Sequence, residues 1–373
     1  MSQSVQRRHL WLALSPHGFG HAAMTAPVID ALRRRCPHLR LTIQTSLPRS
    51  FLEERYGSDF EQVEEIPDFG LKMVSATRID VEASAKSYRE FHADWPGLVR
   101  REAERLRVAG PDLVLANIPY VTIAAAAEVG IPVVALSSLQ WADIYRHYLG
   151  HLPEAGRIGA QMAAAYNSAH TFLRVTPAMA MPSIKNVVDI GVVARRGRDR
   201  HCELRQHLGL TGAGERLGLI AFGGIDHDFP AELWPVMEGW RWFCTGPIPE
   251  GRVDLLPVAA AGMAFSDLLA SVDVVVTKPG YGTFTEAALA GIPVLYIKRP
   301  DWPESPFLDD WLEKHTRALA VEVDDLLGEG LRLQLRKLFA LPNHDVATAS
   351  GNEEAAIALE RLLRDTSIAC ERS

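Results

Sequence analysis

The chain has 373 residues, which is more than one typical domain contains, and its formal net charge of −7 gives no general attraction to nucleic acid or to anionic membranes. Its 47% hydrophobic and 23% charged residues are ordinary for a soluble globular protein. The four cysteines are far apart and form no CxxC motif, so we expect a reducing, cytoplasmic environment and no zinc site. No run of 18 apolar residues predicts a membrane span, although a peripheral membrane contact is compatible with the sequence.

Strand-like apolar runs alternate with helical patterns along the whole chain, which predicts an α/β fold with parallel sheets. The expected strands are 9–15, 40–46, 111–117 and 131–138 in the first half, and 217–224, 241–246, 272–278 and 292–298 in the second. A region rich in glycine and charge, 191–215, separates the two series. We therefore expect two doubly wound, Rossmann-like domains at 1–195 and 196–350, followed by a terminal helix at 351–373 that packs back on the first domain.

A glycine loop, SPHGFGHAAM (15–24), follows the first expected strand. Gly18 and Gly20 form only a fragment of a dinucleotide fingerprint, which is weak evidence for NAD. Ligands bind at the carboxyl edge of such a sheet, where His17 lies in the loop and His21 opens the next helix. A neutral imidazole there could serve as a general base. The alternative is that one or both histidines simply bond loop backbone.

The two halves contain an internal repeat. The segment 112–136 aligns with 273–297 without a gap, and ten of the 25 positions are identical. Pro119 is replaced by Gly280, and Val121 by Gly282. Added glycines before a helix expose N–H groups at its positive end, which predicts a site for an anion such as a diphosphate.

Glu286 replaces Ala125 of the first copy and allows two interpretations. Thr283-x-x-Glu286 fits a capping box, with the glutamate in the helix's first turn. The rival is a carboxylate that accepts both hydroxyls of a ribose. The first copy keeps Thr122 but lacks the acid, so capping is dispensable and the ligand interpretation is favoured.

Gly223 and Gly224 follow the first expected strand of the second half. They could supply backbone N–H groups to a phosphate, or form a tight turn.

Three motifs, HGFGH (17–21), KPGYGTFTEA (278–287) and RPDWPESPFL (299–308), together resemble GT-B glycosyltransferases. The resemblance covers nearly the whole chain. It extends to the UDP-glycosyltransferases and the peptidoglycan N-acetylglucosaminyltransferase, and is closer still to the glycosyltransferase-like domain of plant L-arabinokinases.

The resemblance implies roles for these residues. Four of them would face the donor diphosphate, with Gly223 and Gly224 nearby: Gly280, Tyr281, Gly282 and Thr283. Glu286 would bind the ribose and His21 would be the general base. Glu304 and Ser305 fall where the family contacts the donor sugar, although Gln or Asp is commoner there. Lys278 and Arg299 could neutralise phosphate, and a surface role suits Arg299 equally.

The expected reaction is therefore transfer of a sugar from a nucleotide-diphosphate sugar, with a UDP-sugar as the expected donor, to a hydroxyl acceptor held by the first domain. No cofactor or metal is expected, because no DxD motif is placed to hold one. A non-catalytic nucleotide-sugar-binding module and a GT-B-fold epimerase are the alternatives, and an oxidoreductase is more distant because its fingerprint is incomplete. Sugar transfer, donor binding without turnover, and proton exchange at C2 of the sugar would tell the first three apart.

Overall fold

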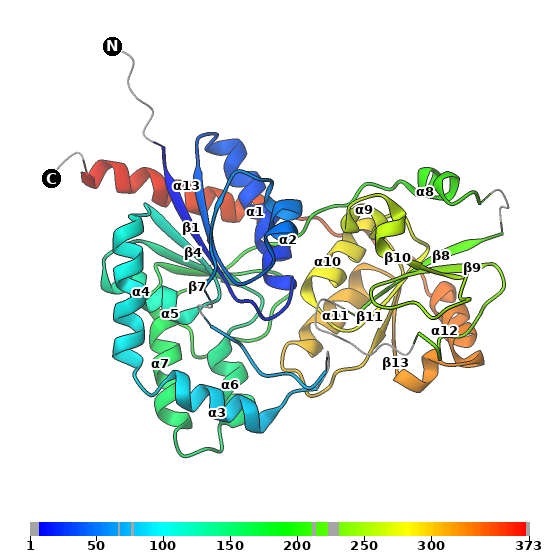
Figure 1. Ribbon diagram of the computed structural model, residues 1–373, viewed down its shortest axis with the longest axis horizontal. Helices are drawn as coiled ribbons and strands as arrows, with labels where there is room; N and C mark the ends of the chain where they lie inside the picture. The colour runs from blue at the N-terminus through cyan, green and yellow to red at the C-terminus, as the bar shows by residue number, and fades with distance from the viewer. Residues whose placement is uncertain (1–6, 66–67, 76–77, 211–213, 223–230, 371–373) are drawn as a thin grey trace, which may run out of the picture. The chain divides into compact units, whose positions relative to one another are not determined.

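The computed structural model describes residues 7–65, 68–75, 78–210, 214–222 and 231–370, without the side chains of 366–370. Its contacts divide the chain into two compact units (Figure 1). Unit 1 comprises Met1–Val74, Ile79–Val193 and Ser350–Ser373, and unit 2 comprises Ser75–Arg78 and Ala194–Ala349. Each unit is an α/β layer structure with a parallel sheet, as the alternation of strands and helices predicts.

Unit 1 contains a seven-stranded sheet in the order β3-β2-β1-β4-β5-β6-β7. Its strands are β1 His9–Leu14, β2 Arg40–Gln44, β3 Glu61–Val63, β4 Leu113–Asn117, β5 Val133–Ser137, β6 Thr171–Arg174 and β7 Val187–Asp189. Its helices are α1 Gly20–Arg35, α2 Arg49–Tyr56, α3 Val81–Phe91, α4 Trp95–Ala109, α5 Tyr120–Glu128, α6 Trp141–Leu149, α7 Ala155–Asn167 and α13 Gly351–Cys370. The central strands β1, β4 and β5 are buried along their whole length because helices cover both faces of the sheet.

Unit 2 contains a six-stranded parallel sheet in the order β10-β9-β8-β11-β12-β13. Its strands are β8 Arg216–Ala221, β9 Trp240–Cys244, β10 Leu255–Pro257, β11 Val274–Thr277, β12 Val294–Ile297 and β13 Ala318–Val321. Its helices are α8 His201–His207, α9 Phe265–Leu269, α10 Tyr281–Ala290, α11 Ser305–His315 and α12 Glu329–Ala340, with 3₁₀ turns at Val258–Ala261 and Val323–Leu326. In both sheets the strand order reverses beside the first strand, between β1 and β4 and between β8 and β11. Ligands of such sheets bind at that point, outside the carboxyl ends of the strands.

The internal repeat is the same structural unit in both sheets. The gapless alignment of the two copies places the first residue of β4 on that of β11, α5 on α10, and β5 on β12. Each helix is followed by a glycine in the left-handed region, Gly130 at φ 72° and Gly291 at φ 70°. Glycine has no Cβ penalty there, so both copies stop their helix in the same way.

The terminal helix α13 packs on α1 of unit 1 and is fixed by ion pairs (Figure 1). Arg35 Nε donates to Glu360 Oε2 at 2.6 Å, and Arg34 Nη2 donates to Glu353 Oε1 at 2.6 Å. Glu360 is buried and is also joined by Arg364, so its carboxylate is well paired. Among the residues that the structure describes, no helix is long and apolar enough to cross a bilayer.

The expected position of Glu286 in its helix is wrong. Gly280 is the N-cap of α10 and Tyr281 is its first residue, so Thr283 is the third residue and Glu286 the sixth. A capping box needs the acid three residues after the cap, so Glu286 cannot form one. Tyr281 is buried at 6% exposure, and its packing starts the helix earlier than the two glycines suggest.

Candidate functional site

His21 lies at the carboxyl edge of the unit 1 sheet, in the first turn of α1, which follows β1. Its side chain is 8% exposed, and its Nδ1 lies 2.6 Å from Oδ1 of Asn117, the last residue of β4. Asn117 Nδ2 faces the Leu136 carbonyl oxygen at 2.5 Å. A carbonyl only accepts, so the Asn117 amide orientation is fixed and its Oδ1 must accept from His21.

This geometry selects one tautomer of His21. Nδ1 carries the hydrogen, and Nε2 carries the lone pair. No other described residue hydrogen-bonds His21 Nε2. Burial lowers the pKa of His21 to about 4, against a smaller opposing effect of the Asn117 hydrogen bond. At neutral pH the ring is therefore neutral and its Nε2 can accept a proton.

Trp141, the first residue of α6, is fully buried and contacts both histidines of the glycine loop. Its ring centroid lies 5.2 Å from that of His17, edge to face, and 6.1 Å from that of His21. His17 is half-buried and also packs close to Gly70, whose hypothetical Cβ would lie 2.9 Å from His17 Cγ. These contacts place both predicted histidines at one edge of one sheet.

An acid that the sequence analysis does not predict, Asp68, completes this cluster. It is 1% exposed and accepts a 2.6 Å hydrogen bond from the hydroxyl of Ser15, the residue after β1. Burial raises the pKa of Asp68 to about 7, although Ser15 and Trp141 oppose the shift. Asp68 lies between β3 and α3, where no recognisable motif marks it. Trp141 could have been found from the sequence, because the alignment of the repeat, continued along the chain, places it on Trp302.

In unit 2, the equivalent edge is built from the loop before α10. Gly280 has φ −170°, which is extended backbone, and a Cβ there would meet its nearest neighbour at an ordinary 3.8 Å. The fold alone therefore does not require glycine at this position. The first N–H groups of α10, at Tyr281, Gly282 and Thr283, lie at the positive end of the helix. Glu286 is 5% exposed, one turn further along.

Cations gather beside this helix start. Lys278 follows β11, and the pKa of its ammonium is lowered to about 8, first by burial and then by the charge of Arg299, against the opposing charge of Glu304. Arg299, which is 6% exposed, lies with its guanidinium carbon 4.3 Å from the ring centroid of Trp302. Trp302 Nε1 in turn donates to Glu304 Oε2 at 3.1 Å. The surface role considered for Arg299 is therefore wrong, because its side chain is buried.

Ser305, the first residue of α11, is 1% exposed, and its hydroxyl has no hydrogen-bond partner among the described residues. A buried hydroxyl without a partner costs free energy, and a hydrogen bond from a ligand would offset that cost.

The remaining predicted glycines differ in whether the backbone conformation requires a glycine. Gly18 has φ 85°, a conformation that requires glycine whatever the function. Gly20 opens α1, and a Cβ there would meet nothing within 4 Å, so space does not demand a glycine. Gly223 and Gly224 lie outside the described residues.

Known proteins resemble the chain in sequence and in fold. No model of a known protein family matches the chain. The chain is 26% identical over 373 residues to an L-arabinokinase of Arabidopsis thaliana, covering 98% of this chain but only 35% of that relative. Among solved structures it is similar to the calicheamicin glycosyltransferase CalG4, with a TM-score of 0.59, 15% identity and coverage of 97% and 95% of the two chains. The chain has the GT-B fold.

Two further structures share the GT-B fold with it. Medicago truncatula UGT71G1, solved with UDP-glucose, gives a TM-score of 0.58 at 12% identity, covering 98% of this chain and all of that one. A UDP-N-acetylglucosamine 2-epimerase of Listeria monocytogenes, titled as putative, gives 0.56 at 14% identity, covering 99% and 98%. The resemblance in the sequence to GT-B glycosyltransferases is thereby confirmed at the level of the fold.

Proposed function

We propose that the protein is a glycosyltransferase that moves a sugar from a nucleotide-diphosphate sugar, with a UDP-sugar as the expected donor, to a hydroxyl acceptor. The observation that carries this proposal is His21 at the carboxyl edge of a GT-B unit, with Nδ1 bonded to Asn117 and Nε2 left as an acceptor. It is supported by the helix start and cations at the equivalent edge of unit 2.

His21 is the general base of the proposed reaction. Its Nε2 takes the proton of the acceptor hydroxyl while the acceptor oxygen forms a bond to the anomeric carbon. The bond from that carbon to the donor diphosphate breaks, and the nucleotide diphosphate leaves. Asn117 keeps the ring in the productive tautomer, and its neutral amide raises the basicity of the imidazole less than a carboxylate would.

Unit 2 would hold the leaving group. The N–H groups at the start of α10, together with Lys278 and Arg299, supply positive charge where negative charge develops. This charge comes from the chain's own residues, which is why we propose transfer without an essential metal. Glu286 would bind the ribose hydroxyls, and Glu304 and Ser305 the sugar.

The test separates binding from chemistry. Thermal stability of the purified protein against UDP, GDP, ADP, dTDP and CDP identifies the base, since a ligand at about 100 times its Kd adds about 2.7 kcal/mol. Glu286→Ala should lose that stabilisation and stay folded, because Ala125 occupies the equivalent place in α5. His21→Ala should keep it and lose sugar transfer by about 10²- to 10⁴-fold. Turnover unchanged in His21→Ala would remove His21 from the mechanism.

A second function, epimerisation of a nucleotide sugar, is favoured by one observation. It needs an acid in unit 1, and Asp68 is a buried carboxyl bonded to Ser15 of the glycine loop. Deuterium incorporation at C2 of the sugar, lost in Asp68→Asn, would support it. Donor binding with neither transfer nor exchange would instead indicate a non-catalytic binding module.

A further inference from the structure

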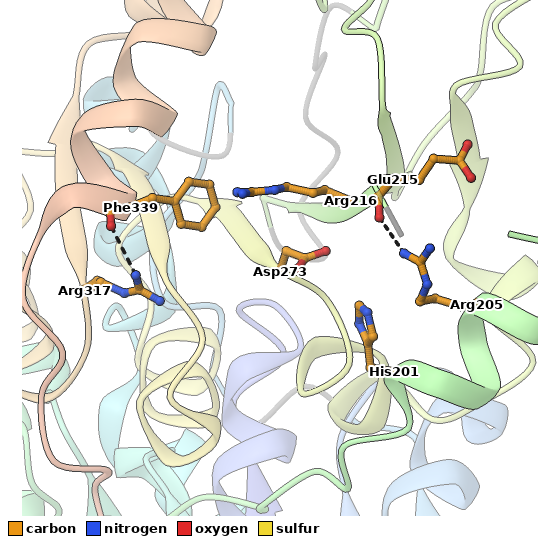
Figure 2. A pocket seen from close by; sticks show the side chains of 8 residues that line it. His201, Arg205, Glu215, Arg216, Asp273, Arg317 and Phe339 are labelled. Atoms are coloured by element: carbon orange, nitrogen blue, oxygen red, sulfur yellow. Dashed lines mark hydrogen bonds between the residues drawn. The ribbon is translucent and has the colours of Figure 1, made fainter. Parts of the chain in front are cut away.

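The amino edge of the unit 2 sheet, opposite the candidate site, contains a hollow of about 780 Å³ (Figure 2). The residues at or just before the first residues of three strands line it: Arg216 at β8, Asp273 before β11 and Arg317 before β13. The hollow is also lined by His201 and Arg205 from α8 and by Phe339 from α12.

Two of these arginines are held without a carboxylate. The guanidinium carbon of Arg216 lies 4.7 Å from the ring centroid of Phe339, and that of Arg317 lies 5.8 Å from the same centroid. Arg317 Nη1 also donates to the Phe339 carbonyl oxygen at 3.3 Å. Neither guanidinium forms an ion pair with a described residue. Both guanidinium groups therefore lie against the Phe339 ring, while their charge is not compensated by an ion pair with a described residue.

The carboxylates near the hollow do not neutralise these cations. Glu215 pairs with Arg241 at 3.6 Å, and Figure 2 shows its side chain pointing away from Arg216 and Asp273. Asp273 is engaged by the backbone, since its Oδ2 accepts from the Leu217 N–H at 2.7 Å. Arg216 and Arg317 thus share the hollow with one carboxylate, Asp273, that is bonded to the backbone.

The internal repeat allows the surroundings of Asp273 to be compared with those of the equivalent aspartate in unit 1. In unit 1 the equivalent aspartate, Asp112, also accepts a backbone N–H at the start of the first strand, with His9 N at 2.7 Å from its Oδ2. The arginine before that residue, Arg8, closes the corner with an ion pair to Asp112 Oδ1 at 3.1 Å. In unit 2 the corresponding arginine is Arg216, which lies on Phe339 instead. The same scaffold is therefore closed by an ion pair in one copy and left open and cationic in the other.

We infer that this hollow is a second anion site, which binds a phosphate group through Arg216 and Arg317. Arginine matches phosphate because its planar guanidinium presents paired N–H donors. A second hollow of about 480 Å³ shares Arg216 and Phe339 and is lined by the apolar side chains of Met237, Trp240 and Leu335, with Arg332 and Arg336 beside them. The ligand class is thus a phosphate attached to an apolar or aromatic group, from either a soluble organophosphate or a lipid head group.

Inorganic pyrophosphate and phosphatidylcholine vesicles with and without phosphatidylglycerol are the probes. Calorimetry of the full chain with pyrophosphate should show binding that Arg216→Gln/Arg317→Gln weakens at least about tenfold, as loss of charged hydrogen bonds predicts. Lys278→Gln, at the carboxyl edge, should spare this binding, which separates it from the donor site. Arg361→Gln, at an exposed arginine of α13, is the control for the loss of a single surface charge, and each single variant, Arg216→Gln and Arg317→Gln, is compared with it.

If vesicles containing phosphatidylglycerol bind and pyrophosphate does not, the phosphate belongs to a lipid, provided that the same double variant abolishes the binding. A footprint on the wild type avoids any folding defect of the variant: the bound probe should slow the reaction of Arg216 and Arg317 with phenylglyoxal. Equal binding by wild type and double variant, or unprotected arginines at saturating probe, would overturn the inference. Neither result bears on sugar transfer, so the proposed function stands or fails separately.

Discussion

Replacement of His21 should change how the protein's stability depends on pH. The folded state holds His21 neutral, with a pKa of about 4 that burial lowers from 6.5. In the unfolded chain the ring is free to take a proton below pH 6.5. The unfolded state therefore binds more protons between pH 6.5 and 4, and stability from this group is present above pH 6.5 and is lost as the pH falls through 4.

The magnitude follows from the two pKa values. At pH 5 the unfolded ring is almost fully protonated and the folded ring is not, which costs about 2 kcal/mol relative to pH 7. Below pH 4 the cost reaches its limit of about 3 kcal/mol, from 1.36 kcal/mol for each unit of pKa difference. These are large changes against a typical folding free energy of about 10 kcal/mol.

The assay is urea unfolding of wild type and His21→Gln at pH 7 and pH 5. The pH dependence of the wild type alone does not isolate the contribution of His21. As the pH falls from 7 to 5, Asp68 increases the stability of the folded state. His92, whose pKa is lowered to about 4 by burial, decreases it, as His21 does. Lowering the pH from 7 to 5 should reduce the free energy of unfolding of the wild type by about 2 kcal/mol more than that of His21→Gln. His38→Gln removes an exposed histidine and should show no such change. A difference that is constant with pH would refute the assignment of His21 as a buried neutral base.

Three further predictions concern the candidate site. Asp68 has its pKa raised to about 7, so its contribution to stability should fall as the pH rises from 4 to 7, and Asp68→Asn, followed by urea unfolding, should remove that fall. Nucleotide affinity, measured by calorimetry, should weaken as the pH rises through the Lys278 pKa of about 8, and Lys278→Arg should extend tight binding to higher pH. An affinity of the wild type that does not change with pH would exclude contact between Lys278 and the diphosphate. Gly280→Ala should leave the unfolding midpoint unchanged, because its backbone is extended and its Cβ has room, yet should weaken nucleotide binding; full affinity would show that no ligand approaches this backbone.

The fold could be predicted from the sequence because its signals are long and repeated. The buried central strands are apolar runs of four to six residues, and the gapless internal repeat shows that the same unit occurs twice. The strands β3, β7 and β10 were not predicted, because each has only three residues and so short a run does not distinguish a strand from a loop. The edge-side strands β6 and β13 were missed as well, since each is short and only half of its residues are buried.

The candidate site could be predicted only in part. The histidines and glycines stand next to strand ends, where a local pattern marks them. The partners that decide their chemistry are distant in the chain: His21 and Asn117 are 96 residues apart, and Ser15 and Asp68 are 53 apart. The position of Glu286 was wrong for a local reason, since glycine is a poor helix former and yet Gly282 lies inside α10.

The divergence of the repeat is consistent with the proposed division of the two substrates between the two halves. Asn117 at the end of β4 corresponds to Lys278 after β11, and Ser138 corresponds to Arg299. The carboxyl edge of unit 1 is therefore neutral and keeps an imidazole uncharged, while the same edge of unit 2 carries two buried or half-buried cations. In the proposed reaction the second arrangement would stabilise a diphosphate, and the first would serve a hydroxyl that must lose a proton to a neutral base. If the exchange Asn117→Lys placed a cation beside His21, it would lower the pKa of that imidazole further and remove the acceptor of its Nδ1 hydrogen. The tautomer and the remaining basicity of the proposed base therefore depend on this one difference between the copies.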